Sequence, residues 1–202
     1  MMVRVEGILL AAGESRRMGF PKPLLRLNSH TFIEHAALAM LDSVAQLIIV
    51  LGAHAERVRA AIPRDSRVTV VDNPDWRQGQ LSSLRTGLCA IGRDAAAAMV
   101  HLTDHPTVQP ATYSALASEF GRSPTQILIA RHHGRRGHPV IFARGIFDEL
   151  MVAPNEGGAR VVVNADPSRV AYLEVDDPGV TLDLDTPADL ARAGLPPPPG
   201  GE

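Results

Sequence analysis

Apolar residues along the chain recur with two periods, one typical of buried strands and one typical of amphipathic helices. In the first half, aliphatic runs predict strands at 3–10, 47–51, 68–71 and 98–102. Between them, apolar positions spaced by three or four residues predict helices at 32–41, 55–62 and 81–91. This alternation predicts a three-layer α/β/α fold of the Rossmann-like kind, in which helices cover both faces of a mostly parallel sheet.

The second half of the chain has a less regular pattern. It predicts helices at 111–120 and from Pro187 onward, and strands at 127–130, 139–142, 170–175 and, over a short stretch, near Val180. No internal repeat or linker divides residues 1–195, so we expect them to form one domain. Residues 196–202 are a Pro/Gly-rich run that we expect to be disordered.

Composition then limits the classes of function. The 202 residues are 45% hydrophobic, so the core needs no metal or disulfide to hold it together. Cys89 is the single cysteine, and no apolar run approaches the roughly 20 residues that a membrane span needs. We therefore expect a cytoplasmic protein with no membrane partner. A net charge of −2 and an aromatic content of 4% argue against nucleic acid as a partner.

The segment after the first predicted strand carries the strongest chemical signal. From Leu10 to Lys22 it reads Leu-Ala-Ala-Gly-Glu-Ser-Arg-Arg-Met-Gly-Phe-Pro-Lys. Small residues let backbone N–H groups approach an anion, and Arg17 and Lys22 add positive charge, so the segment is expected to bind phosphate. Lys22 is the one lysine among 20 basic residues, which favours a position that needs a compact ammonium. The spacing matches neither a Walker loop nor a Gly-x-Gly-x-x-Gly dinucleotide loop.

This segment resembles the signature of the MobA-like nucleotidyltransferases, which attach a nucleotide to molybdopterin cofactors. The single residue between Gly19 and Pro21 distinguishes it from the longer loops of isoprenoid cytidylyltransferases and sugar-phosphate nucleotidyltransferases. Nearly the whole chain is similar to the family, through segments 73–84, 137–140, 156–160 and 182–189. The resemblance implies a fold of the nucleotide-diphospho-sugar transferase type and a nucleotidyltransferase domain over 1–195.

The resemblance also implies the residues of a nucleotide site, which are Leu10, Ala11, Ala12, Gly13, Ser15, Arg17, Lys22, Asn73, Gly79, Ser82 and Ser83. Arg17, Lys22 and Asp104 are the expected catalytic residues. CTP is the expected donor because the Ala11-Ala12-Gly13 run resembles the cytidylyl branch, whereas the guanylyl branch more often has a second glycine. GTP remains the alternative donor.

Three aspartates are expected to bind Mg²⁺. Asp104 follows a predicted strand end, where its carboxylate can hold Mg²⁺ against triphosphate oxygens; the alternative is an ordinary turn aspartate. Asp183 and Asp185 lie two apart in an extended segment, which would point them to the same side, and one of them could complete the metal site. The alternative for this pair is a turn aspartate and a helix cap before Thr186.

The acceptor is expected to contact His105, Arg136 and His138. The family more commonly has glycine and then methionine or glutamine around the metal-binding aspartate, where this chain has Thr103 and His105. The neighbourhood of His132, His133 and His138 also contains arginines, and without cysteine partners a basic loop that meets the acceptor's phosphate is favoured over a transition-metal site. Trp76 is expected to pack rather than to stack on a base.

The sequence thus predicts transfer of CMP from CTP to the phosphate of molybdopterin, with release of pyrophosphate. The acceptor phosphate is already ionised near neutral pH, so no general base is required. Three alternatives stay open: guanylyl transfer from GTP, cytidylyl transfer to a non-pterin phosphate, and a non-catalytic carrier of the cofactor. A carrier could dispense with Lys22 and Asp104, so their presence favours an enzyme. A molybdoenzyme is the expected transient partner.

Overall fold

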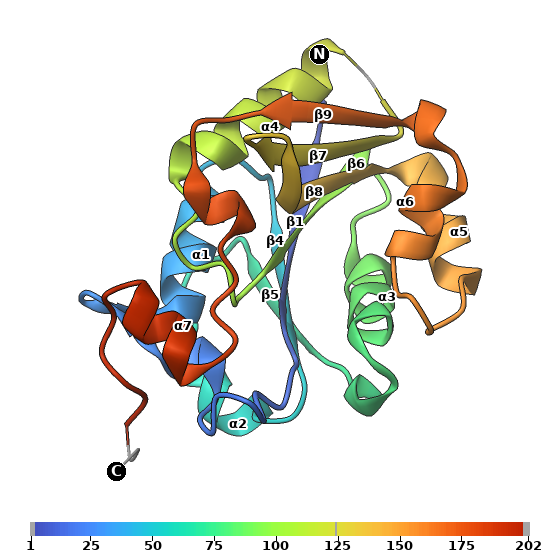
Figure 1. The fold of residues 1–202 in the computed structure, drawn as a ribbon. Coiled ribbons are helices and arrows are strands. Elements are labelled where there is room, and N and C mark those ends of the chain that lie inside the picture. The colour runs from blue at the N-terminus through green and yellow to red at the C-terminus, as the bar shows by residue number, and fades with distance from the viewer. Residues whose placement is uncertain (1–2, 124, 200–202) are drawn as a thin grey trace.

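A seven-stranded sheet forms the centre of the computed structural model, which describes residues 3–123 and 125–199. The strand order is β5-β4-β1-β6-β8-β7-β9 (Figure 1). All neighbours pair in parallel except β8, which is antiparallel to both β6 and β7. The strands are β1 (Val5–Ala11), β4 (Leu47–Leu51), β5 (Val68–Asp72), β6 (Ala97–Leu102), β7 (Ile127–His132), β8 (Arg135–Ala143) and β9 (Val170–Glu174). The predicted mostly parallel sheet is confirmed.

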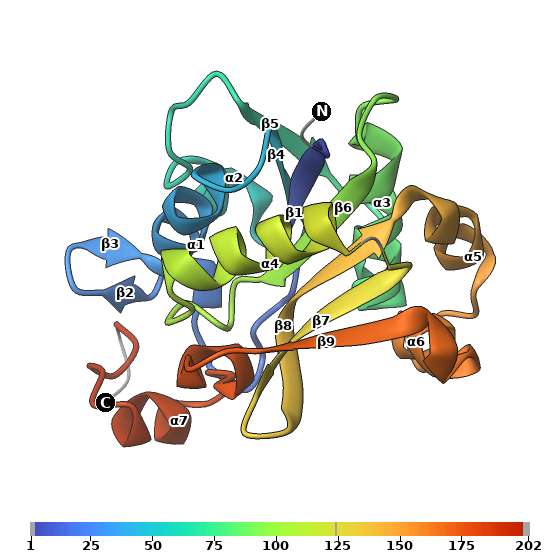
Figure 2. The ribbon, with the colours of Figure 1, turned by 90° about the horizontal axis from the view of Figure 1, so that it is seen from above.

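Helices cover both faces of the sheet, as the three-layer prediction requires (Figures 1 and 2). One face carries α1 (Phe32–Leu41), α2 (Ala55–Arg59) and α4 (Pro110–Arg122). The other carries α3 (Gln80–Ala90), α5 (Phe147–Val152) and α6 (Arg160–Ala165). A small hairpin, β2 (Arg26–Leu27) and β3 (His30–Thr31), and the last helix, α7 (Pro187–Arg192), lie beside the first face (Figure 2).

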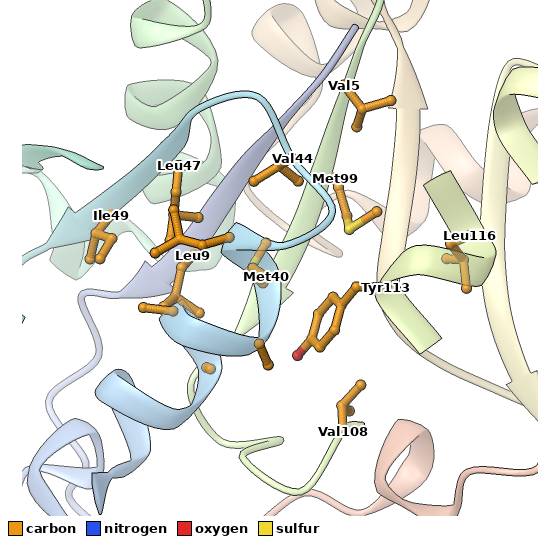
Figure 3. Packing of buried hydrophobic residues seen from close by; sticks show 14 of the residues in the cluster. Val5, Leu9, Met40, Val44, Leu47, Ile49, Met99, Val108, Tyr113 and Leu116 are labelled. Carbon is orange, nitrogen blue, oxygen red and sulfur yellow. The ribbon is translucent and has the colours of Figure 1, made fainter. Parts of the chain in front are cut away.

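The core consists of one apolar cluster on each face of the sheet. Figure 3 shows part of the first, where Leu9 of β1, Met40 of α1 and Tyr113 of α4 meet. The second cluster joins the other side of β1, at Ile8, to Leu84 of α3. Strands that are apolar on both sides, as β1 and β4 are, are typical of a parallel sheet covered by two helical layers.

The segment near Val180, predicted as a strand, is instead a 3₁₀ helix, η5 (Pro178–Thr181). Asp177 caps it, because the carboxylate accepts a hydrogen bond from the N–H of Gly179 at 3.0 Å, and Pro178 fixes its first turn. Val180 is buried within the core rather than paired with a strand. The six-residue helices α5 and α6 were not predicted, because they are too short to show a helical period.

The side chain of Asp177 fastens η5 to the N-terminus of α4. Its Oδ2 accepts hydrogen bonds from the N–H of Gln109 at 2.9 Å and from Thr112 Oγ1 at 2.6 Å. Gly137 and Gly179 let backbones approach, since a Cβ at Gly137 would lie 1.9 Å from the carbonyl oxygen of Val180. These contacts fix the path of the chain just before Asp183 and Asp185.

The end of the chain forms no helix or strand over 196–199. Residues 200–202, the rest of the run that we expect to be disordered, lie outside the described residues. No helix within 3–123 or 125–199 is long and apolar enough to cross a membrane.

Replacement of Asp177 by alanine should destabilise the fold. The substitution removes three hydrogen bonds to a buried carboxylate and leaves two backbone N–H groups without their acceptor, which predicts a loss of about 2–4 kcal/mol in the free energy of unfolding. Urea denaturation measures this loss. Asp176→Ala, at an exposed neighbour, is the control and should change stability by less than about 0.5 kcal/mol. Equal effects of the two substitutions would contradict the assigned role.

Candidate active site

The loop after β1 folds back on itself so that Lys22 lies near the end of the strand. Ser15 adopts a left-handed conformation with φ +58°, and its Oγ accepts a hydrogen bond from the N–H of Lys22 at 3.0 Å. A turn closes between Ser15 and Gly19, whose φ of +72° favours glycine. Lys22 then begins a 3₁₀ helix, η1 (Lys22–Leu24). The loop is therefore shaped by its own hydrogen bonds.

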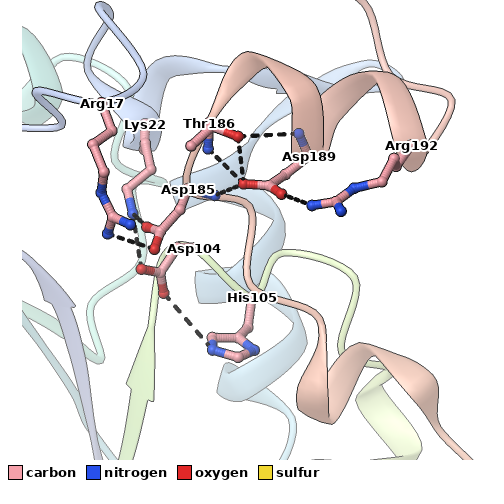
Figure 4. Close-up of polar contacts among 8 residues, drawn as sticks. All are labelled: Arg17, Lys22, Asp104, His105, Asp185, Thr186, Asp189 and Arg192. Carbon is pink, nitrogen blue, oxygen red and sulfur yellow. Dashed lines mark hydrogen bonds and ion pairs between the residues drawn. The ribbon is translucent and has the colours of Figure 1, made fainter.

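Lys22 bridges two carboxylates that come from distant parts of the chain (Figure 4). Its Nζ donates to Asp104 Oδ2 at 2.9 Å and to Asp185 Oδ1 at 2.6 Å. Arg17 donates to the other oxygen of Asp185, at 2.6 Å. The Lys22 side chain is only 15% exposed, whereas that of Arg17 is 71% exposed. Two cations of the loop thus meet two anions at the carboxyl ends of the strands.

The electrostatic balance keeps both partners of the Lys22–Asp104 pair charged. Burial by itself would lower the pKa of Lys22, but Asp104 and Asp185 hold it above its usual value. Burial would likewise raise the pKa of Asp104, but Lys22 outweighs that effect and the pKa is lowered. The Oδ1 atom of Asp104 is buried without a hydrogen-bond partner, and His105 Nε2 lies 4.0 Å from it. One carboxylate oxygen therefore remains available for a cation.

Asp185 is positioned by a hydrogen bond to Asp189, in the first turn of α7. Asp189 accepts hydrogen bonds from the N–H groups of Asp185 and Thr186, at 3.1 and 2.7 Å (Figure 4). Thr186 is the N-cap of the helix, so the cap considered in the sequence is Thr186 and neither Asp183 nor Asp185. Asp183 is exposed, and it lines a cleft that also contains Asp104. Asp185, not Asp183, shares Lys22 with Asp104.

A cleft of about 470 Å³ lies between the loop after β1 and the start of α3. We call it the loop cleft. Among the residues that the sequence assigned to the nucleotide, it is lined by Leu10, Ala12, Gly13, Ser15, Lys22, Gly79 and Ser83. Ala11 instead faces the core, and Arg17 turns outward to Asp185. Most of the predicted nucleotide residues therefore line one concave surface.

Asn73 and Ser82 lie behind this surface, in a buried hydrogen-bond network. The amide of Asn73 donates to Ser82 Oγ at 2.9 Å and to Ser83 Oγ at 3.0 Å. Ser82 in turn donates to the carbonyl oxygens of Asp75 and Gly79. The network fixes the first turn of α3, so these two side chains shape the cleft without lining it.

A second cleft, of about 850 Å³, opens over β6, β7 and β8; we call it the sheet cleft. The three predicted acceptor residues, His105, Arg136 and His138, all line it. Arg136 is exposed and donates to Asn164 Oδ1 at 3.0 Å. Arg135, which belongs to the predicted basic loop, lines the same cleft. Arg160 also lines it; the sequence assigned this arginine no role, although the 156–160 segment had pointed to this region.

His105 and His138 line the sheet cleft, and the fully buried ring of His101 lies close to both. The ring centroids of His105 and His138 lie 5.2 Å apart, and His101 lies 6.3 and 6.4 Å from them. Burial, together with the charge of His105, lowers the pKa of His138 to about 4. Burial also lowers the pKa of His101, so the rings of His101 and His138 are neutral near neutral pH. No cluster of at least three potential ligands with metal-binding geometry occurs among the described residues, and His132 and His133 lie at the β7–β8 turn.

The two clefts meet at Asp104. Leu10, Gln80, Leu102 and Asp104 line both of them, and Lys22 stands at the junction. The sequence assigned no ligand role to Gln80, Arg77 or Trp76, which line the loop cleft, because nothing in a single polar or aromatic residue shows which way it faces. Two ligands that occupied the two clefts would meet beside a buried lysine and a carboxylate with a free oxygen.

Comparison with known proteins identifies the family of the chain. The family model described as the MobA-like NTP transferase domain matches residues 7–171. The chain is similar to the molybdenum cofactor cytidylyltransferase of Escherichia coli K12, with 25% identity over 95% of this chain and 96% of that protein. It is also similar to the molybdenum cofactor guanylyltransferase of Rhodobacter capsulatus, with 30% identity over 95% of each chain.

A solved structure extends the similarity to three dimensions. The manganese complex of Rv0371c from Mycobacterium tuberculosis H37Rv superimposes with a TM-score of 0.79 and 31% identity, over 95% of this chain and 98% of that one. The sequence signature, the sheet topology and the family match lead to one assignment. The chain belongs to the MobA-like NTP transferase family and is a nucleotidyltransferase.

Proposed function

We propose that this protein transfers CMP from CTP to the terminal phosphate of molybdopterin. A phosphate oxygen of the acceptor forms a bond to the α-phosphorus of CTP, and the bond from that phosphorus to the bridging oxygen breaks, which releases pyrophosphate. No covalent enzyme intermediate is involved. A molybdoenzyme that takes up the product is the protein partner that this reaction implies.

The junction of the two clefts is the observation that carries the proposal. A transfer between two bound ligands needs two neighbouring sites and a charged group where they meet. The loop cleft would hold the nucleotide, the sheet cleft the acceptor, and Lys22 and Asp104 lie where the clefts join. A carrier for one ligand would need only one of the two clefts.

Lys22 would stabilise the transition state electrostatically. Negative charge increases around the α-phosphorus as the acceptor oxygen approaches, and a fixed ammonium in a partly buried site stabilises such charge more than water does. Asp104 and Asp185 hold the ammonium in place at 2.9 and 2.6 Å. The backbone around Gly13 and the exposed guanidinium of Arg17 are suited to the remaining phosphate oxygens.

The carboxylates of Asp104 and Asp185 fit a bound Mg²⁺. They already share one cation, the Lys22 ammonium, and Asp104 Oδ1 is a buried oxygen without a partner. Asp104 and Asp185 would hold the ion, with Asp183 as the remaining candidate from the sequence. When bound, Mg²⁺ neutralises phosphate charge and polarises the phosphorus–oxygen bonds.

The sheet cleft is suited to an acceptor with a flat ring system and a phosphate. Arg135, Arg136 and Arg160 line it and provide positive charge for the phosphate, while its floor includes aliphatic side chains such as Val100 and Ile129. His105 and His138 would contribute as hydrogen-bonding groups. This is the basis for proposing molybdopterin rather than a small non-pterin phosphate.

Ala12 favours a pyrimidine donor. Ala12 lines the loop cleft and is held in place there, because its carbonyl accepts a hydrogen bond from the N–H of Ala53 at 3.1 Å and Gly52 packs against it. A glycine at this position would leave more room for a purine. One methyl group gives only a modest preference.

Pyrophosphate release by the purified protein tests the reaction and the donor together. With Mg²⁺ and molybdenum cofactor, we expect release with CTP, at a kcat/KM about 10-fold above that with GTP because of the Ala12 methyl group. The control omits the cofactor and should release none. Pyrophosphate release with GTP but not with CTP would contradict the donor assignment. Release that requires a different phosphorylated acceptor would contradict the assignment of molybdopterin as the acceptor.

Substitution of the junction residues tests the catalytic roles. Lys22→Ala and Asp104→Asn should each lower kcat by about 100-fold or more, because each removes charge at the reacting phosphate. Lys22→Arg keeps the charge but replaces the compact ammonium by a planar group, so it should also lose about 10-fold or more. Arg122→Ala, on the far end of α4, is the control. Unchanged cofactor delivery with no turnover in any variant or in the wild type would identify a carrier.

His138 predicts an acid-sensitive stability. Its pKa is about 4 in the folded chain and near 6.5 when unfolded, so its contribution is fully present above pH 6.5 and is lost as the pH falls toward 4. Between about pH 7 and pH 5 the loss should be about 1–2 kcal/mol in the free energy of unfolding. Urea denaturation at both pH values, compared with His138→Gln, measures it. The same pH dependence in the variant would assign the effect to other groups.

A further inference from the structure

Trp76 forms part of the wall of the loop cleft. It begins a 3₁₀ helix, η2 (Trp76–Gln78), in the segment between β5 and α3, and its side chain is half-buried. It is the single tryptophan of the chain. Among the described residues, Trp76 is the one aromatic residue in the lining of this cleft, and the small residues Ala12 and Gly13 line the same cleft.

The backbone of Trp76 is tightly held. A Cβ added at Gly52 would lie 2.8 Å from Trp76 Cβ, so glycine is needed for the close contact between η2 and the end of β4. The N–H of Gly79 donates to the carbonyl of Trp76 at 3.1 Å and closes the turn. The packing role that the sequence predicted for Trp76 therefore applies to its Cβ, which contacts Gly52. It does not explain the position of the indole ring.

The guanidinium of Arg77 covers one face of the indole. The guanidinium carbon of Arg77 lies 4.3 Å from the centroid of the Trp76 ring. Arg77 is exposed, and within the described residues its side chain takes part in no hydrogen bond or ion pair. A cation–π contact at an exposed site is weak. A planar group of the ligand could therefore replace the guanidinium over the ring at little cost.

The order of the strands separates the two ends of the loop cleft. Asp104 follows β6, on one side of β1, whereas Trp76 follows β5, on the other side and at the edge of the sheet. Phosphates that reach Lys22 and Asp104 occupy the first end. The nucleobase, at the opposite end of a nucleotide, would then lie toward Trp76.

We propose that the indole of Trp76 is the platform on which the nucleobase of the donor stacks, in the place over the ring that the guanidinium of Arg77 holds. The inference rests on the proposed use of the loop cleft by a nucleotide. Stacking acts on any base, so Trp76 would supply affinity for both CTP and GTP, and the preference between them would come from elsewhere in the cleft. Arg77, which lines the same cleft, could then contact the edge of the base.

The single tryptophan makes the contact directly measurable. Titration of the wild-type protein with CTP, with GTP and with inorganic tripolyphosphate, in the presence of Mg²⁺, should change tryptophan fluorescence with the two nucleotides and leave it nearly constant with tripolyphosphate. Calorimetry of the same three titrations establishes that tripolyphosphate binds. An equal fluorescence change with tripolyphosphate would overturn the proposal, because it would report phosphate binding alone.

Variants of Trp76 give the second measurement. By calorimetry, Trp76→Leu should raise the Kd for the better nucleotide by about 10-fold, and Trp76→Phe, which keeps an aromatic face, by less than about 3-fold. The Kd for tripolyphosphate should change by less than about 2-fold in either variant, which also shows that the cleft is intact. If Trp76→Leu leaves the Kd for the nucleotide unchanged, the stacking role of Trp76 is wrong, but the proposed reaction is unaffected. If the wild type binds tripolyphosphate but neither nucleotide, the donor assignment fails as well.

Discussion

The ion pairs of Lys22 hold together three segments that are remote in sequence. Lys22 contacts Asp104, 82 residues away, and Asp185, 163 residues away. The loop after β1, the end of β6 and the segment 182–186 before α7, which we call the strap, therefore converge on one ammonium. A partly buried lysine without these carboxylates would lose charge, and carboxylates without the lysine would repel each other. The lysine and the carboxylates therefore each need the other to stay charged at this position. The same ion pairs thus shape the site and hold the loop after β1 against the rest of the fold.

The rest of the fold can be understood as support for this contact. The parallel strands β1 and β6 are neighbours, which brings the loop and Asp104 to the same edge of the sheet. Asp185 follows no strand of the sheet, and its position depends on contacts of the preceding segment. Asp177 fastens η5 to α4, and Leu184, itself buried, donates its N–H to the carbonyl of Asp104 at 2.9 Å. Because the backbone at Asp104 and Asp185 is held by these contacts, the two carboxylates can keep a fixed distance from each other when the more exposed residues of the loop after β1 move.

The sequence predicted most of this fold because its information is local. Helix 32–41 was predicted to the residue from its apolar spacing, and the structure adds a capping box of Thr31 and Glu34 at its start. The loop after β1, Lys22 and Asp104 were likewise singled out from their positions after strands, and the structure brings them together. What failed needed tertiary contacts: η5 was predicted as a strand because Val180 is apolar, and the cap from Asp177 has no periodic signal. The orientation of Asp185 toward Lys22 depends on that same strap.

The charges at the junction explain why a polyanionic ligand needs further cations. Arg17, Lys22, Asp104 and Asp185 carry two positive and two negative charges, so as a group they are neutral and attract a triphosphate only weakly from a distance. Positive charge must therefore be added where the nucleotide lies. Arg77 lines the loop cleft and can supply part of it, whereas Arg16 is already paired with Glu14 at 2.7 Å. Asp104 and Asp185 would hold a divalent cation, and its charge would offset part of the charge of the triphosphate.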